Sequence, residues 1–177
     1  MATTRYFVIV YVVTAGLHGD DLGSDEEEIV LFAWLVVDIA NCKIVAAQCK
    51  FVKPRSADVN ENVLSEVARN HFGLSEDQIK SGQPLENVLE EFDQFAKAKL
   101  HSESGRSFHL ITDGQFHLRQ VVHPEACNKG ISLPDYFHTF YDLRKEFRKF
   151  YRNNDITTIE DMVNCILFKT LQNNVPN

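Results

Sequence analysis

This sequence of 177 residues has little of what marks the unusual classes of protein. Its 8 glycines and 5 prolines are too few for a collagen-like or low-complexity chain, and its 44% hydrophobic residues exclude a disordered one. The longest apolar run, residues 29–37, is about half the length that crosses a membrane. We therefore expect a single globular domain over residues 1–177 with no membrane contact.

Positive charge and paired cysteines are also scarce. The 18 Lys and Arg stand against 25 Asp and Glu, giving a net charge of −7, so nucleic acid is not the default partner, although a local patch can still bind it. The four cysteines form no C-x-x-C pair, and no N-x-S/T sequon occurs, which predicts free thiols in a reducing compartment. Arg5 and the apolar residues after it imitate a signal peptide, but their β-branched and aromatic side chains favour a buried strand.

Several catalytic motifs are missing. There is no P-loop, G-x-S-x-G or G-x-G-x-x-G, so neither acyl transfer nor nucleotide hydrolysis has support. The acidic run at residues 20–28 lacks calcium-loop spacing and predicts a solvated loop. His109 and His117 flank a Thr-Asp-Gly at residues 112–114, where a strand ends; we interpret both as structural histidines, with a site as the alternative.

What is present is a strong pattern of alternating strands and helices. The continuous apolar character of residues 5–14 predicts a strand buried on both faces. Ser75 with Gln78 forms a capping-box pattern, Gly73 ends the helix before it, and Pro84 starts a longer helix. Strands are predicted over 5–14, 29–37, 42–52, 107–112 and 136–142, and helices over 58–72, 75–79, from Pro84 onward, 115–122, 143–152 and 159–171. This order suits an α/β, ribonuclease H-like domain with a mixed five-stranded sheet and helices on both faces.

One segment concentrates cations and rings. Its basic side chains are interleaved with aromatic residues, a pattern typical of single-stranded nucleic-acid binding by charge and stacking. The basic residues are Arg144, Lys145, Arg148, Lys149 and Arg152. The interpretation that we favour is an amphipathic helix. Its Leu143, Phe147 and Phe150 or Tyr151 would face the core and leave the cations solvated.

Longer motifs carry a family resemblance. These are residues 110–126, Leu133-Pro134, 141–147, 22–26 and 36–41. Together they resemble the N-terminal domain of the Fusilli/epithelial splicing regulatory protein family over residues 6–168. The resemblance implies a nuclear regulator of alternative splicing with protein partners. RNA would be bound mainly through other domains of the full-length protein, and a homo-oligomer is compatible with it.

A more distant similarity bears on mechanism. Four stretches of the sequence are similar to DEDD-type 3′-5′ exonucleases. They are residues 72–79, 112–114 and 143–145, and Ile159-Glu160-Asp161 with Asn164. Those enzymes hold two metal ions with four carboxylates and use a histidine as general base. At the corresponding positions this chain has Tyr11, Val13, His117 and Ile156, and it retains only Asp161. Between Asn154 and Thr157 the chain is also about one helix shorter than those enzymes.

Three functional hypotheses follow. The replaced carboxylates predict a domain that is not an enzyme and holds no metal or other cofactor, and the Fusilli/epithelial splicing regulatory protein resemblance implies that it acts as a nuclear protein-interaction module. The alternative is a domain that binds single-stranded RNA through residues 144–152. A third, weaker hypothesis is a nuclease that uses His117 with Asp161 as unusual ligands.

Overall fold

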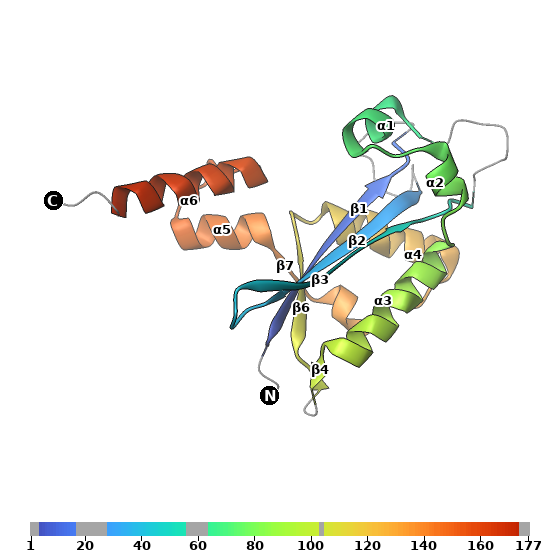
Figure 1. Ribbon diagram of the computed structural model, residues 1–177, viewed down its shortest axis with the longest axis horizontal. Coiled ribbons are helices and arrows are strands. Elements are labelled where there is room, and N and C mark those ends of the chain that lie inside the picture. The colour runs from blue at the N-terminus through green and yellow to red at the C-terminus, as the bar shows by residue number, and fades with distance from the viewer. Residues whose placement is uncertain (1–3, 17–27, 56–63, 103–104, 174–177) are drawn as a thin grey trace.

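The predicted mixed five-stranded sheet forms the centre of the molecule. The computed structural model describes residues 4–16, 28–55, 64–102 and 105–173 (Figure 1). The sheet has the strand order β3-β2-β1-β6-β7. β1 (Tyr6–Thr14) and β2 (Ile29–Asp38) are antiparallel, as are β2 and β3 (Lys43–Phe51). β6 (Phe108–Thr112) runs parallel to β1, and β7 (Phe140–Asp142) runs parallel to β6.

One face of the sheet carries the main core. α3 (Leu85–Lys99) lies against it, together with η1 (Phe116–Val122) and η2 (Asp135–His138), and α4 (His123–Lys129) continues from η1. Rings from strands and helices meet there: Trp34 lies 5.2 Å and Phe32 5.9 Å from Phe92, centroid to centroid. Such edge-to-face and tilted contacts add to the free energy gained by burying the rings. The core therefore fixes the strands against α3.

The opposite face is covered only at one end. There α1 (Glu66–Phe72) and α2 (Glu76–Lys80) pack over Val13 and the partly buried Leu31 and Phe51. Farther along the strand, Ile9 and Tyr11 are 36% and 39% exposed. The prediction that this strand is buried on both faces is wrong, because these helices are too short to reach its middle.

The local signals that stop and start helices are confirmed. Gly73 ends α1 with φ of 64°, in the left-handed region that favours glycine. Ser75 and Gln78 make the reciprocal hydrogen bonds of a capping box at the start of α2. Pro84 precedes α3. The helix predicted from residue 58 begins at Glu66, and residues 56–63 lie outside the described part of the chain.

Other elements differ from the prediction. The helix predicted over 115–122 is the wide π-type helix η1, Phe116–Val122, which runs directly into α4. The strand predicted over 136–142 begins as the 3-10 turn η2, and only its last three residues join the sheet. A small hairpin of β4 (His101–Ser102) and β5 (Gly105–Arg106) was not predicted. All four cysteines are free, as expected.

The last two helices lie together beside the sheet. α5 (Leu143–Tyr151) and α6 (Ile159–Asn173) project to one side of the strands (Figure 1). α5 buries none of its residues, and Phe150 is 79% exposed. Leu143, Phe147 and Tyr151 are half-buried, so the interpretation of α5 as an amphipathic helix holds for these side chains, whereas Phe150 does not face the core. No helix in the described ranges is long and apolar enough to span a membrane.

The acidic run ends in a partly buried ion cluster. Residues 20–27, predicted as a solvated loop, lie outside the described part of the chain. Glu28, however, pairs with Lys129 at 2.6 Å, and Lys129 pairs with Glu125 at the same distance. Glu125 also accepts a hydrogen bond from the backbone N–H of Ile29 at 2.7 Å. This cluster joins α4 to the beginning of β2.

Candidate functional site

A pocket of about 420 Å³ opens where β1 and β6 end. Parallel neighbouring strands end at the same edge of a sheet, and in α/β folds sites gather at that edge. Four elements besides β1 contribute to the pocket: α1, the turn after β6, η1 and the start of α5. The residues that line it are Tyr11, Val12, Val13, Thr14, Gly16, Val67, Ala68, His71, Phe72, Asp113, Phe116, His117 and Arg144.

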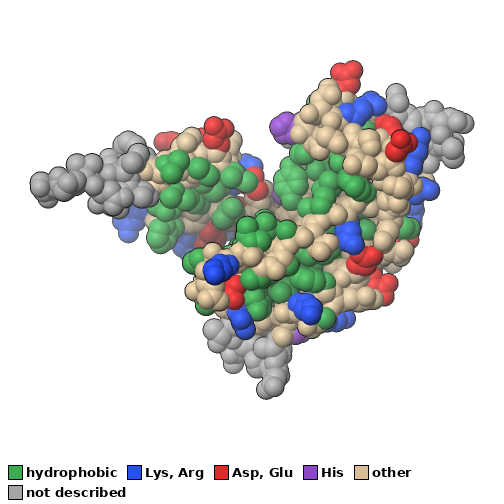
Figure 2. All heavy atoms as spheres, in the orientation of Figure 1, with side chains coloured by type: hydrophobic (Ala, Val, Ile, Leu, Met, Phe, Trp, Pro, Cys, Tyr) green, Lys and Arg blue, Asp and Glu red, His purple; other side chains and the backbone are tan. Residues whose placement is uncertain are grey.

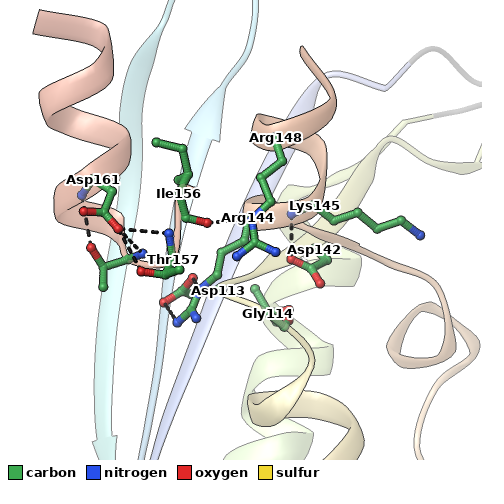
Figure 3. Close-up of polar contacts among 11 residues, drawn as sticks. Asp113, Gly114, Asp142, Arg144, Lys145, Arg148, Ile156, Thr157 and Asp161 are labelled. Atoms are coloured by element: carbon green, nitrogen blue, oxygen red, sulfur yellow. Dashed lines mark hydrogen bonds and ion pairs between the residues drawn. The ribbon is translucent and has the colours of Figure 1, made fainter. Parts of the chain in front are cut away.

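An ion pair lies at one wall of the pocket. The Arg144 Nη2 donates to Asp113 Oδ2 at 2.8 Å, and Nε donates to Oδ1 (Figure 3). This fork arrangement joins the turn after β6 to the first turn of α5. The side chains of Arg144 and Asp113 are 38% and 17% exposed, so a ligand in the pocket can still reach the guanidinium.

His117 and Tyr11 form a second wall. Their ring centroids lie 4.4 Å apart, and His117 is 7% exposed. His117 Nδ1 accepts a long hydrogen bond, 3.4 Å, from the backbone N–H of Val12, so Nε2 carries the proton in the neutral ring. Burial lowers the pKa of His117, against an opposing effect of Asp113. Burial also raises the pKa of Tyr11, as does the Asp113 charge. Both groups are therefore neutral donors near pH 7.

The predicted catalytic positions are only partly brought together. Tyr11, Val13 and His117 line the pocket, whereas Ile156 and Asp161 do not. Ile156 is 5% exposed, and its carbonyl oxygen accepts a hydrogen bond from Arg148 Nε at 2.6 Å.

Asp161 has a local structural role. Its carboxylate accepts hydrogen bonds from the backbone N–H groups of Thr157 and Thr158, at 2.9 and 2.8 Å, and from the Thr157 hydroxyl (Figure 3). These hydrogen bonds lower the pKa of Asp161 to about 2. The hypothesis that His117 and Asp161 share a metal is not supported, because Asp161 is directed into its own helix start.

The pocket residues do not fit the two metal ions that the exonuclease similarity implies. A magnesium ion takes about six oxygen ligands, mostly carboxylates, phosphates and water. In the described part of the chain, Asp113 is the one carboxylate that lines the pocket, and both its oxygens already accept from Arg144. The described part of the chain contains no group of three or more His, Cys, Asp or Glu side chains arranged to hold a metal ion.

The five predicted nucleic-acid-binding cations divide into two groups. Arg144 lines the pocket, and Arg148 is held by the Ile156 carbonyl. Lys145 and Lys149 are exposed and lie one turn apart on the same face of α5, and the exposed Arg152 follows directly as the C-terminal cap of that helix.

Some pocket residues were missed by sequence reasoning. His71 and Phe72 come from α1, and the centroid of Phe72 lies 6.3 Å from that of Tyr11. Phe72 begins the 72–79 stretch that is similar to exonucleases, but neither residue was predicted to have a role at a site, because only the packing of α1 against the end of β1 brings them to the pocket. His109, in contrast, lies away from it beside Tyr141, with ring centroids 5.2 Å apart.

Several solved structures with a similar fold are nucleases. The nuclease domain of 3′hExo, a DEDDh family member solved bound to rAMP, has a TM-score of 0.72 and 19% identity, covering 84% of this chain and 72% of that one. Cell-death related nuclease 4 (CRN-4) has a TM-score of 0.70 and 20% identity, covering 89% and 51%. A full-length 3′-exonuclease has a TM-score of 0.72 and 19% identity, covering 85% and 48%. The predicted ribonuclease H-like, DEDD exonuclease-like fold is confirmed.

Comparison of sequences also finds an exonuclease, at low identity. ERI1 exoribonuclease 2 of Xenopus laevis is 23% identical over 140 residues, which are 71% of this chain and 20% of that protein. The chain thus spans about a fifth of this curated relative and about half of the full-length exonuclease. No family model matches the chain.

These comparisons correct one prediction. The chain was expected not to be an enzyme, but its curated relative and its structural neighbours are nucleases. The expectation rested on the replaced carboxylates alone, and nothing in the comparisons indicates that activity has been lost.

Proposed function

We propose that this exonuclease-like domain binds single-stranded RNA, with the 3′-terminal nucleotide in the pocket and the preceding backbone along α5. The observation that carries the proposal is the position of Arg144. It lines the pocket and belongs to the same helix as the exposed cations Lys145 and Lys149, which the exposed Arg152 follows at the C-terminal cap. Pocket and basic face are therefore continuous.

The basic face has the chemistry of a backbone-binding surface. Three exposed cations, two on α5 and one at its C-terminal cap, can each neutralise a phosphate and release a counterion. Phe150, on the same helix and 79% exposed, offers a ring on which a base can stack. A chain with a net charge of −7 then binds RNA through this local patch, not through its overall charge.

The pocket supplies groups for a nucleotide at the end of the strand. Tyr11 and Phe72 are 39% and 38% exposed and present aromatic surface for a base. Arg144 and the Nε2–H of His117 can donate hydrogen bonds to phosphate or sugar oxygens. The ribonucleotide bound to one structural neighbour and the exoribonuclease name of the curated relative support RNA as the ligand.

Fluorescence anisotropy with a 5′-labelled single-stranded RNA of about ten nucleotides tests the proposal. We expect binding that weakens with salt, and a log–log slope that falls by about 2 when Lys145, Lys149 and Arg152 are all changed to Gln. The matched control changes the exposed Lys80, Lys97 and Lys99 of α2 and α3 to Gln, which alters the net charge equally and should leave the slope unchanged.

Two outcomes would contradict the proposal. One is absence of binding near physiological salt, and the other is an equal loss of affinity in the two triple variants. An RNA with a blocked 3′ end should bind more weakly if the pocket takes the terminus. Denaturing electrophoresis of the same RNA shows in parallel whether the bound end is shortened.

We further propose that the chain works within a nuclear regulator of alternative splicing that has protein partners. The support is the Fusilli/epithelial splicing regulatory protein resemblance of residues 110–126 and 141–147. The test deletes residues 6–168 from the full-length protein and follows its location in the cell and the exon inclusion of a reporter. Unchanged splicing together with a location outside the nucleus would refute this part without affecting the RNA-binding proposal.

A further inference from the structure

A large part of the sheet surface opposite α3 is apolar and uncovered. We call it the open face, and it is formed by Phe7, Ile9, Leu35, Val37, Ile44 and Ala47. The pairings Ile9–Leu35–Ala47 and Phe7–Val37–Ile44 place these side chains on one side of β1, β2 and β3. None is charged, and Ile9 and Ile44 are 36% and 65% exposed.

The same chain exposes an apolar stripe on a helix. Ile159, Val163, Ile166 and Leu167 of α6 follow the spacing of one helical face and are 43% to 55% exposed. Figure 2 shows hydrophobic side chains gathered both over the strands at the centre and over the α5–α6 pair at the side. A helix with such a stripe gains stability only when another surface covers it.

The connection between α5 and α6 holds the stripe away from its own sheet. Arg148 Nε binds the Ile156 carbonyl, and the Asp161 carboxylate binds the backbone of Thr157 and Thr158. Ile156 and Met162 are 5% and 4% exposed, so the start of α6 is anchored beside α5. Figure 1 shows the rest of α6 extending outward from there.

The two surfaces match in size. α6 has 15 residues and is about 22 Å long at 1.5 Å per residue. The open face spans three strands, β1 to β3, whose two spacings of about 4.8 Å make it roughly 10 Å wide, about the diameter of one helix with its side chains. One helix therefore covers the open face, and a short, pinned connection between two elements favours exchange between copies over folding back.

We propose that the chain forms a two-fold symmetric homodimer in which the α6 stripe of each copy packs across the open face of the other. Each copy gives one helix and receives one, so both apolar surfaces are covered and the assembly closes. The pocket lies beyond the open face, at the Tyr11–Gly16 end of β1, and stays accessible. The dimer thus does not depend on the RNA-binding proposal.

Size-exclusion chromatography with light scattering tests the dimer. The chain should have a mass of about twice 20.3 kDa. Ile166→Glu with Leu167→Glu on the stripe should give a monomer, and so should Ala47→Glu on the open face. The matched controls are Asn164→Glu on the polar side of α6 and Gln48→Glu on the other side of β3, both exposed, and both should remain dimeric.

The proposal is wrong if the chain is a monomer at about 100 µM. It is also wrong if the chain is a dimer that the stripe and open-face variants leave intact. If the chain is monomeric and hydrogen exchange shows a protected α6 that Ala47→Glu exposes, the helix covers its own sheet. Thermal melts of each variant separate loss of the dimer from loss of the fold, and an RNA titration should give the same affinity for Ala47→Glu and Gln48→Glu.

Discussion

Arg144 and Asp113, 31 positions apart in the sequence, form a two-pronged ion pair at the wall of the pocket. The pair connects the end of β6 to the start of α5, and it neutralises the one cation that both the pocket and the basic helix share. Because Asp113 is mostly buried whereas Arg144 is more exposed, the carboxylate restrains the arginine without removing it from reach of a ligand.

Changing Asp113 to Asn should therefore tighten RNA binding. The substitution removes a negative charge from the pocket and frees Arg144 to bind phosphate. We expect affinity to rise by about 3- to 10-fold, equivalent to roughly 1 kcal/mol of repulsion removed. Anisotropy titrations at low salt measure it. Asp135→Asn, which removes the same charge from η2, serves as the control, and an Asp113→Asn variant that binds more weakly than the control would contradict the role of the pair.

His117 should make stability depend on pH. Its pKa is lowered by burial, so the folded state favours the neutral ring. A lowered folded-state pKa means that its contribution is complete above the unfolded value near 6.5 and is lost as the pH falls below it. The melting temperature should drop between pH 7 and 5, and less so in His117→Leu. His101→Gln, at an exposed position, should retain the full drop; an NMR titration of His117 with a midpoint above 6.5 would refute the argument.

Asp161 should act on structure and not on RNA binding. Asp161→Ala removes the acceptor of three hydrogen bonds at the start of α6, so hydrogen exchange of residues 157–162 should quicken. RNA affinity should stay within twofold of the unaltered chain. Since hydrogen bonds lower its pKa to about 2, the contribution of Asp161 is present above the unfolded value near 3.8 and is lost as the pH falls towards 2. A selective loss of RNA binding would instead place Asp161 at the site.

Glu125 should be the most sensitive position outside the hydrophobic core. Glu125 is 2% exposed, and the Lys129 side chain that it pairs with is 7% exposed. Removing Glu125 leaves Lys129 paired with Glu28 alone and leaves the backbone N–H of Ile29 without its acceptor. Glu125→Ala should cost about 3–5 kcal/mol in the free energy of unfolding, measured by urea denaturation.

The control for that experiment is Glu86→Ala. Glu86 pairs with Arg55 at 3.6 Å, but both side chains are about half exposed. Its loss should cost less than about 1 kcal/mol. Equal costs for Glu86→Ala and Glu125→Ala would show that burial does not determine the strength of these pairs.

Local signals in the sequence were enough to predict most of the helices and strands. The capping box at Ser75, the stop at Gly73 and the start at Pro84 act through the nearest backbone groups, so they predict helix ends without knowledge of the fold. The strands β2 and β3 and the overall α/β order followed from runs of apolar residues. The replacement of the exonuclease carboxylates by Tyr11 and Val13 is likewise a property of the sequence itself.

The tertiary structure alone decided which residues meet. The pairing of Asp113 with Arg144, the arrival of Phe72 at Tyr11 and the separation of Asp161 from His117 depend on how distant elements pack. Whether the apolar faces of β1 and α6 are covered is also a property of the assembled chain. A sequence pattern shows that a side chain is apolar, but it does not show what buries that side chain. Burial requires a second surface in contact with the first, and that contact forms only when the chain folds or associates with another copy.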